Sequence, residues 1–245
     1  MDGERDSQRG SFLGPAFDPR ELLKRAKIAN VELTDDALPR RVAALLAKGN
    51  VVGWFQGRIE FGPRALGNRS ILADPRIPEM QEKLNLKIKF RESFRPFAAA
   101  VMLERVADYF ELRQSSPYML LVAPVKPAIR LDGQLQANRA GFLDRSKTPR
   151  SSIPAVTHVD HSARVQTVSA DENPRFYALL RAFEAQTGCA VLVNTSFNVR
   201  GEPPVCTPAE AFSCFMRTGM DYLVLGNFLV DKRAQLATRT TDALP

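Results

Sequence analysis

The order of apolar and polar positions along the chain predicts helices and strands that alternate. Helical spacing of apolar residues predicts helices over 19–29, 35–48, 78–88 and 174–187, a helical turn in 104–110, and a helix that begins at Pro208 after Thr207. Short apolar runs predict strands at 51–55, 70–73, 97–103, 118–122, 156–158, 164–168, 190–193, 221–225 and 228–230. Strands mixed with helices are typical of an α/β or α+β domain.

Polar stretches predict where this domain begins and ends. Residues 1–17 are a polar tail followed by a linker with a turn at Gly14-Pro15, and residues 234–245 are predicted to be a disordered tail. Residues 18–233 are therefore predicted to form the domain. Within it, residues 126–150 are basic and weakly patterned, which predicts a long loop or insertion.

Composition narrows the class of protein. The 245 residues are 44% apolar and 25% charged, which is typical of a globular chain and excludes disorder as the main state. Three cysteines without a CxxC pair disfavour a disulfide framework or a zinc knuckle. We find no 18-residue apolar run and no apolar signal core, so we expect a cytoplasmic protein without membrane partners. The net charge of +7, from 34 cationic and 27 anionic side chains, favours anionic ligands.

The stretch from Gln56 to Ser70 follows an apolar strand and contains three glycines and three arginines. Glycine permits close backbone approach, and arginine presents a planar, permanently charged fork to phosphate or carboxylate oxygens. The stretch is therefore predicted to bind an anion. It contains neither a GxxxxGK[ST] loop nor a GxGxxG run, so the known phosphate loops with those patterns are excluded.

A second basic stretch, Lys89 to Arg95, follows closely. If it is extended, Lys89, Arg91 and Arg95 all point to one face and repel one another unless an anion binds. From residue 56 to 95, nine Lys and Arg against five Asp and Glu give +4 of the total charge. The alternative is a solvated basic face with structural ion pairs, which is the usual role of a charge run.

Polar residues end the strand that begins near Val191. Asn194, Thr195, Ser196 and Asn198 follow this buried run, and α/β sites are usually built at strand ends. The alternative is an ordinary polar turn, which these residue types also favour.

The two histidines of the chain, His158 and His161, lie three residues apart. On a strand such positions face opposite ways, so we expect no joint metal site and a structural or hydrogen-bonding role for His158. Arg164 lies among strand-forming residues, where an arginine is more informative than on a helix face.

These segments together resemble a known family. The runs GWFQGRIEFGPRALGNRSILADPR, KFRESFRPFA, PAVTHVD with ARVQTV, and NTSFNVRGEPPVCTPAEA are similar to the C-terminal domain of O-carbamoyltransferases that act on nodulation factors, cephems and aminoglycosides. The resemblance covers about residues 12–231. It implies a YrdC/Sua5-like fold, which is a twisted mixed sheet with flanking helices and a concave basic face. The signature of that fold, KxR and SxN, corresponds to Lys89-Phe-Arg91 and Ser196-Phe-Asn198.

The resemblance also implies an activity and its residues. In the family this module binds ATP and carbamoyl phosphate, forms carbamoyl-adenylate and releases pyrophosphate, with Mg²⁺ expected on the phosphates. The residues expected to be catalytic are Lys89, Arg95, Arg64 and Arg69. Those expected to bind substrate or nucleotide are Arg91, Arg164, Ser196, Asn198, Asn194, Thr195 and His158.

Two departures from the family accompany this expectation. The family carries a metal-dependent, Kae1-like domain before this module, and this sequence starts near the linker, so we expect full transfer to need such a domain in trans. His161 stands where the family more often has glycine.

The alternatives to this enzymatic function are a module that docks without catalysis, or one that binds nucleic acid. We expect the latter less, because the basic stretches show no interleaved, exposed aromatic residues for base stacking.

Overall fold

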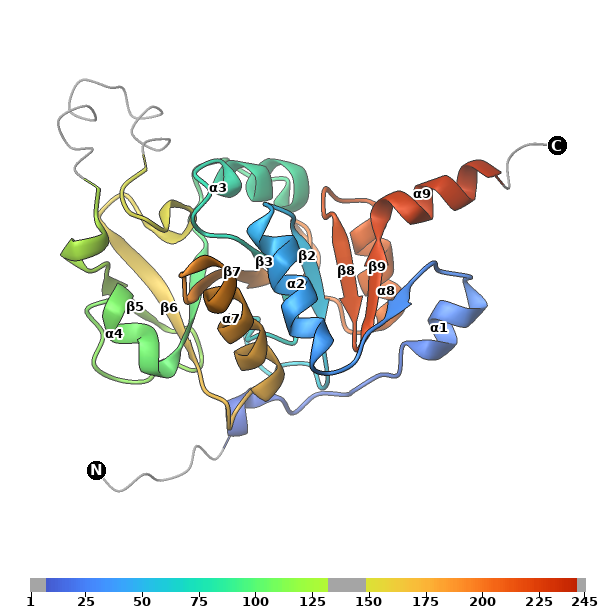
Figure 1. Ribbon diagram of the computed structural model, residues 1–245, viewed down its shortest axis with the longest axis horizontal. Helices are drawn as coiled ribbons and strands as arrows, with labels where there is room; N and C mark the ends of the chain where they lie inside the picture. Colours follow the sequence, from blue (N-terminus) through green and yellow to red (C-terminus); the bar gives the residue numbers. More distant parts are fainter. Residues whose placement is uncertain (1–7, 132–148, 242–245) are drawn as a thin grey trace.

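A computed structural model describes residues 8–131 and 149–241, and it describes the side chains of these residues except Arg9 and 238–241. In this part of the chain, nine strands form one mixed sheet in the order β1-β9-β8-β2-β3-β7-β4-β6-β5 (Figure 1). The strands are β1 (Val31–Glu32), β2 (Val52–Phe55), β3 (Arg69–Ala73), β4 (Ala98–Met102), β5 (Leu121–Pro124), β6 (Ser162–Val168), β7 (Val191–Ser196), β8 (Tyr222–Leu225) and β9 (Phe228–Asp231). The pairs β2/β8 and β4/β6 are parallel, and the others are antiparallel.

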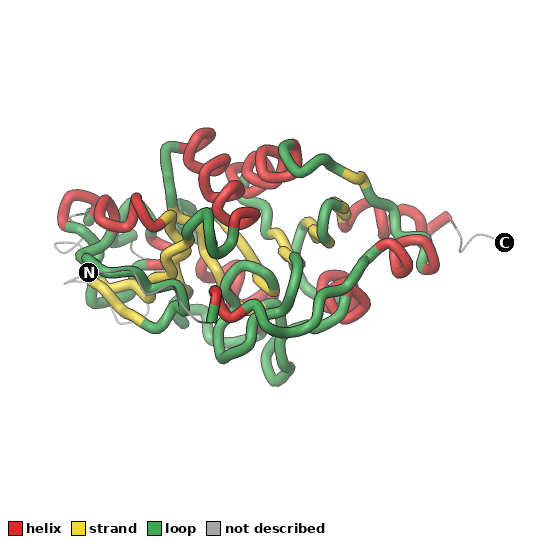
Figure 2. The backbone as a smooth tube through the Cα atoms, turned by 90° about the horizontal axis from the view of Figure 1, so that it is seen from below, coloured by secondary structure: helices red, strands yellow, loops and turns green. Residues whose placement is uncertain are grey.

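Helices flank this sheet on both sides. The α-helices are α1 (Arg20–Arg25), α2 (Ala37–Ala47), α3 (Met80–Leu84), α4 (Val106–Tyr109), α7 (Pro174–Thr187), α8 (Pro208–Met216) and α9 (Lys232–Thr241). Short 3₁₀ segments lie at Arg9–Ser11, Leu103–Arg105, Pro127–Ile129 and Pro154–Val156, and a π-helical turn lies at Asn85–Lys89. In Figure 1, α2 and α7 pack side by side in front of the sheet and α8 lies behind it. Figure 2 shows helices above the strands and mainly looped backbone below them.

The hydrophobic core explains this arrangement. Strands β2, β3 and β4 are buried along their whole length, as expected for central strands covered on both faces. Helix α7 buries Phe176, Leu180 and Phe183 at helical spacing against the sheet and α2. The predicted mixed α/β fold with flanking helices is therefore confirmed.

Capping residues set the limits of two helices at the predicted positions. Asn173 accepts a hydrogen bond from the Phe176 N–H at the start of α7, and Gly188 ends this helix with a φ of 71°. Thr207 and Glu210 form a reciprocal capping box at the start of α8.

The structure corrects two local predictions. Residues 156–158 are not a strand: Pro154 starts a 3₁₀ turn, and Thr157 Oγ1 donates to the Ile153 carbonyl. The tail predicted to be disordered from residue 234 continues as α9 to Thr241, because Gln235 exchanges hydrogen bonds with the backbone of Ala29. The predicted loop at 126–150 lies partly outside the described residues.

The backbone at His161 has a φ of 61°, in the left-handed region that favours glycine. We expect His161→Gly to raise the free energy of unfolding by about 0.5–1 kcal/mol, because a side chain with Cβ is strained there. Chemical denaturation checks this. His158→Gly serves as the control and is expected to destabilise, and a destabilised His161→Gly would show that imidazole contacts outweigh the strain.

Candidate functional site

The loop between β2 and β3 is held in shape by Glu60. Its Oε1 accepts hydrogen bonds from the backbone N–H groups of Leu66 (2.7 Å), Asn68 (2.8 Å) and Arg69 (3.2 Å). The loop that carries Arg64 is therefore folded around one carboxylate oxygen. The sequence analysis did not select Glu60. It could have been noticed as the acidic residue within a stretch rich in arginine and glycine.

We expect Glu60→Gln to lower the free energy of unfolding by about 1–3 kcal/mol, because hydrogen bonds to a charged acceptor are stronger than those to an amide. Urea denaturation measures this change. Glu79→Gln, which removes an exposed carboxylate at the start of α3, is expected to change stability far less. Equal stability of the two variants would contradict the role assigned to Glu60.

Arg69 is buried inside the protein. Its side chain is 0% exposed, donates to the carbonyl oxygens of Gln56, Asn68 and Gly57, and lies 3.5 Å from the centroid of the Phe55 ring. Burial lowers the pKa of Arg69 to about 10, and the Glu60 charge opposes this shift. The Nη1 and Nη2 groups of Arg69 thus fix the loop, whereas its buried Nε has no hydrogen-bond partner among the described residues. The catalytic role expected for Arg69 stays a prediction.

Lys89 brings the two signature motifs together. Its Nζ donates to the carbonyl oxygen of Ser196, to that of Asn198 at 3.0 Å and to Asn198 Oδ1 at 2.9 Å, and it lies 3.3 Å from Ser196 Oγ. Ser196 Oγ in turn donates to Asn198 Oδ1 at 2.7 Å. More than one hundred residues separate these motifs along the chain, so tertiary folding alone creates this contact.

Residues 89–95 are not extended, so the condition under which Lys89, Arg91 and Arg95 would share one face is not met. Lys89 ends a π-helical turn, and Phe90 follows with a φ of 48°. This turn directs Lys89 inward, where it is 4% exposed, whereas the side chain of Arg95 is 55% exposed and 3.9 Å from Glu92. The three cations therefore do not share one face.

Burial lowers the pKa of the Lys89 ammonium to about 7, and the nearby charge of Arg91 adds to this shift. Burial and then Arg95 lower the pKa of Arg91 as well. Arg91 Nε donates to Asn85 Oδ1 at 2.6 Å, and the guanidinium lies 4.8 Å from the Phe97 ring centroid. Asn85, which sequence reasoning missed, also donates to the carbonyl of Arg95, so it fixes the whole turn.

Glu92 lies within a group of arginines on the surface. A hydrogen bond to its own backbone lowers the pKa of Glu92, as do the charges of Arg200, Arg95 and Arg91. Sequence reasoning did not select Arg200, which follows the SxN motif by two residues. The group extends the positive charge outward from Lys89.

Arg64 and Arg164 form a second cationic pair. Burial lowers the pKa of Arg164, and the charge of Arg64 adds to it, so the two guanidinium groups interact. Among residues 8–131 and 149–241, neither side chain has an ion pair, and the buried Nε of Arg64 has no hydrogen-bond partner. Two neighbouring cations without a carboxylate are suited to a bound anion.

The remaining candidates have structural surroundings. Asn194 is 1% exposed, and its Nδ2 donates to the Ala65 carbonyl and to Gln166 Oε1, so it supports the loop. Its buried Oδ1 has no hydrogen-bond partner in the described part of the chain. Thr195 pairs in register with the buried Ile71, on the face of β7 opposite to Asn194 and Ser196.

His158 is half-buried and has a hydrogen-bonding contact, and its expected part in ligand binding stays a prediction. Its Nδ1 lies 3.2 Å from Ser162 Oγ. Burial lowers the pKa of His158, whereas Asp160 opposes the shift. No group of three or more His, Cys, Asp or Glu in the described part of the chain is placed to hold a metal ion.

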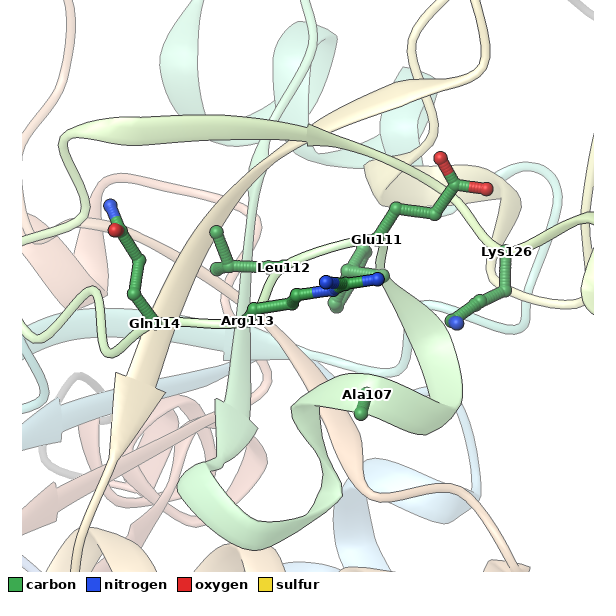
Figure 3. Close-up of a pocket in the computed structure, with 7 residues that line it drawn as sticks. Ala107, Glu111, Leu112, Arg113, Gln114 and Lys126 are labelled. Carbon is green, nitrogen blue, oxygen red and sulfur yellow. The ribbon is translucent and has the colours of Figure 1, made fainter.

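One cavity of about 700 Å³ lies elsewhere, beside α4 (Figure 3). It is lined by Ala107, Phe110, Glu111, Leu112, Arg113, Gln114 and Lys126. In Figure 3 the Arg113 and Lys126 side chains point toward each other and the Glu111 carboxylate points away. None of the residues expected at the active site lines it, so side-chain contacts and not this cavity define the candidate site.

Residues 43–232 match the family described as Carbamoyltransferase C-terminus. The chain belongs to this family. It is 57% identical over 235 residues to an uncharacterized protein of Synechocystis sp., covering 94% of this chain and 38% of that protein. It is 42% identical over 217 residues to nodulation protein NolNO of Sinorhizobium fredii (87% of this chain, 29% of that protein). It is also 42% identical over 186 residues to 3'-hydroxymethylcephem-O-carbamoyltransferase of Amycolatopsis lactamdurans (76% and 31%).

A solved structure shares the fold. Full-length HypF in its phosphate- and nucleotide-bound form aligns with a TM-score of 0.50 and 18% identity, over 78% of this chain and 25% of HypF. The chain spans well under half the length of the curated relatives named above. None of the described helices has the length and apolar character to cross a membrane.

Proposed function

We propose that this domain activates carbamoyl phosphate with ATP, forming carbamoyl-adenylate and releasing pyrophosphate. The observation that carries the proposal is the contact of Lys89 with Ser196 and Asn198, beside which Arg91, Arg95 and Arg200 gather. Arg64 and Arg164 supply a second set of cations. Two anionic substrates repel each other, and two cationic groups offset that repulsion.

The reaction divides into two displacements. Water releases inorganic phosphate from carbamoyl phosphate and leaves carbamate. A carbamate oxygen then attacks the α-phosphorus of ATP, the bond to the β-phosphate oxygen breaks, and pyrophosphate leaves. Such transfers depend on positioning and charge stabilisation and need no protein nucleophile. The described residues offer no acidic metal cluster, so Mg²⁺ would be held mainly by the phosphate oxygens of the substrates.

The test is release of pyrophosphate by the purified chain from ATP and carbamoyl phosphate together. Arg95→Ala should release far less, because Arg95 is exposed at the cationic group and is available to a ligand. Arg181→Ala, an exposed arginine on α7, is the matched control. Absence of both pyrophosphate release and any rise in melting temperature with ATP would refute the proposal.

Full carbamoyl transfer is proposed to need a second, Kae1-like domain that acts in trans on an acceptor hydroxyl. The cephem relative is named an O-carbamoyltransferase, and this chain covers 31% of it. Co-purification of this chain with such a domain, followed by product formation from a hydroxyl acceptor, tests this part. Transfer by the isolated chain would contradict it.

Single-stranded nucleic acid is the second candidate ligand. Contrary to the sequence expectation, exposed aromatic rings do interleave the cations: Phe61 is 75%, Phe90 51% and Phe94 47% exposed. Rings of this kind stack bases, and arginines bind the phosphates. A gel shift that weakens steeply with salt would support this function, and no shift at low salt would exclude it.

A further inference from the structure

Two buried amide side chains, Gln166 and Asn194, meet across the middle of three neighbouring strands. Gln166 is 3% and Asn194 is 1% exposed, and Asn194 Nδ2 donates to Gln166 Oε1 at 2.7 Å. Strand β4 lies between the strands that carry them, with Ala98 paired to Asn194 and Ala100 paired to Gln166. Paired residues present their side chains on the same face of a sheet. Alanine is small, so the two longer side chains can meet over β4.

The backbone of the loop between β2 and β3 fixes the orientation of both amides. A carbonyl oxygen can only accept, so the Leu66 carbonyl requires Gln166 Nε2, which donates to it at 2.8 Å. Gln166 Oε1 is thereby turned toward Asn194. The Ala65 carbonyl likewise requires Asn194 Nδ2, which donates to it at 3.1 Å. Both hydrogens of Asn194 Nδ2 are therefore used, and its Oδ1 faces another direction.

Asn194 Oδ1 is left as a buried acceptor to which no described residue donates. A buried polar atom costs free energy unless it is hydrogen-bonded. The amide cannot simply turn around, because Oδ1 would then face the Ala65 carbonyl and Gln166 Oε1, which are both acceptors. A donor that arrives with a ligand would satisfy this atom.

The surroundings of Asn194 indicate which part of a ligand supplies this donor. Ser196, which contacts Lys89, is two residues further along β7 and shares the face of Asn194. On β6, Arg164 is two residues before Gln166 and shares its face. The amides therefore adjoin cationic groups that suit phosphate. Ionised phosphate oxygens only accept, whereas the carbamoyl group next to the phosphate in carbamoyl phosphate has an NH₂ donor.

We infer that Gln166 is a positioning residue that makes the site selective for the carbamoyl group, because it holds Asn194 with Oδ1 free to accept from the carbamoyl N–H. This inference rests on the proposed function, since it takes carbamoyl phosphate to be the substrate. A ligand of the same shape and charge with a methyl group in place of NH₂ would leave the buried acceptor unpaired. Sites built to hydrogen-bond a substrate N–H reject such analogues for this reason.

The experiment compares two stable phosphonates that differ in one group. Phosphonoacetamide has the NH₂ group, 2-oxopropylphosphonate has a methyl group in its place, and neither releases phosphate. Their dissociation constants are measured by titration calorimetry on the full chain. The wild type should bind the amide at least about tenfold more tightly, because an unpaired buried acceptor costs about that factor. Gln166→Met removes one of the two acceptors that hold Asn194 and should reduce this preference severalfold.

Two further variants separate orientation from packing. Gln166→Glu keeps an acceptor toward Asn194, so it should retain the preference for the amide, although its negative charge should weaken the binding of both phosphonates. Gln186→Met is the matched control. Gln186 is exposed on α7 and its Nε2 also donates to a backbone carbonyl, that of Arg40, so its loss should leave the preference unchanged.

Three results would overturn the inference: no preference in the wild type, an unchanged preference in Gln166→Met, or a lost preference in Gln166→Glu. If the wild type shows no preference and Gln166→Met binds ATP more weakly, the acceptor serves a nucleotide N–H instead, which also overturns it. The outcome is separable from the proposed function. Pyrophosphate release without a preference would refute this inference alone, whereas a preference without pyrophosphate release would refute the proposed reaction alone.

Discussion

Pyrophosphate release by Lys89→Met is expected to fall by about two to three orders of magnitude, the usual effect of removing one preorganised charge from a reacting centre. Lys89 is the donor that connects the two signature motifs, and methionine keeps its length without its charge. Lys24→Met, on the surface of α1, is the control and should keep wild-type activity. Retention of most activity in Lys89→Met would remove Lys89 from the catalytic residues.

Titration of Lys89 is expected to make both the activity and the stability of the protein depend on pH. Because burial lowers the pKa of Lys89 to about 7, kcat/KM for ATP should decline as pH rises through about 7, and Lys89→Met should lack this decline. The free energy of unfolding should change with pH in the opposite direction to the activity.

Between about pH 7 and 10.5 the unfolded chain holds the Lys89 proton and the folded chain does not. The free energy of unfolding of the wild type, relative to Lys89→Met, should therefore rise with pH across this range.

Removal of either member of the arginine pair is expected to have the second largest effect. Arg164→Met and Arg64→Met should each lower kcat/KM for carbamoyl phosphate by about two orders of magnitude, because a charge that stabilises the reacting phosphate is lost. The double variant should lose less than the product of the two effects, since residues that act as a unit are not additive.

Stability distinguishes this role from a structural one. Burial and mutual repulsion disfavour the charge on Arg164, so Arg164→Met should melt at or above the wild-type temperature while losing activity. Arg181→Met, which replaces an exposed arginine on α7, should change neither the melting temperature nor the activity. A variant that loses stability and activity together would indicate that Arg164 is a packing residue.

Much of the fold could be predicted from local pattern. Capping at Thr207 and the glycine after α7 act within one helical turn, so the sequence alone determines where these helices begin or end. The apolar runs at β2, β3 and β7 likewise predict buried strands, because burial on both faces needs continuous apolar residues. The family resemblance, which rests on residues in sequence order, was also available without coordinates and is confirmed.

The environment of each charged side chain was decided only by the tertiary structure. Arg64 and Arg69 look alike in the sequence, and the buried Nε of each has no partner in the described region. The Nη groups of Arg69, however, donate to three backbone carbonyls of its own loop. Lys89 and Arg95 would share one face only on an extended segment, and a π-helical turn that ends at Lys89 directs the Lys89 side chain inward instead. Hydrogen bonds to Ser196 and Asn198 depend on strands far apart in the chain, and desolvation depends on everything packed around a group. Neither quantity is local, so the sequence determined which residues could bind an anion, and only the fold decided which of them are placed to do so.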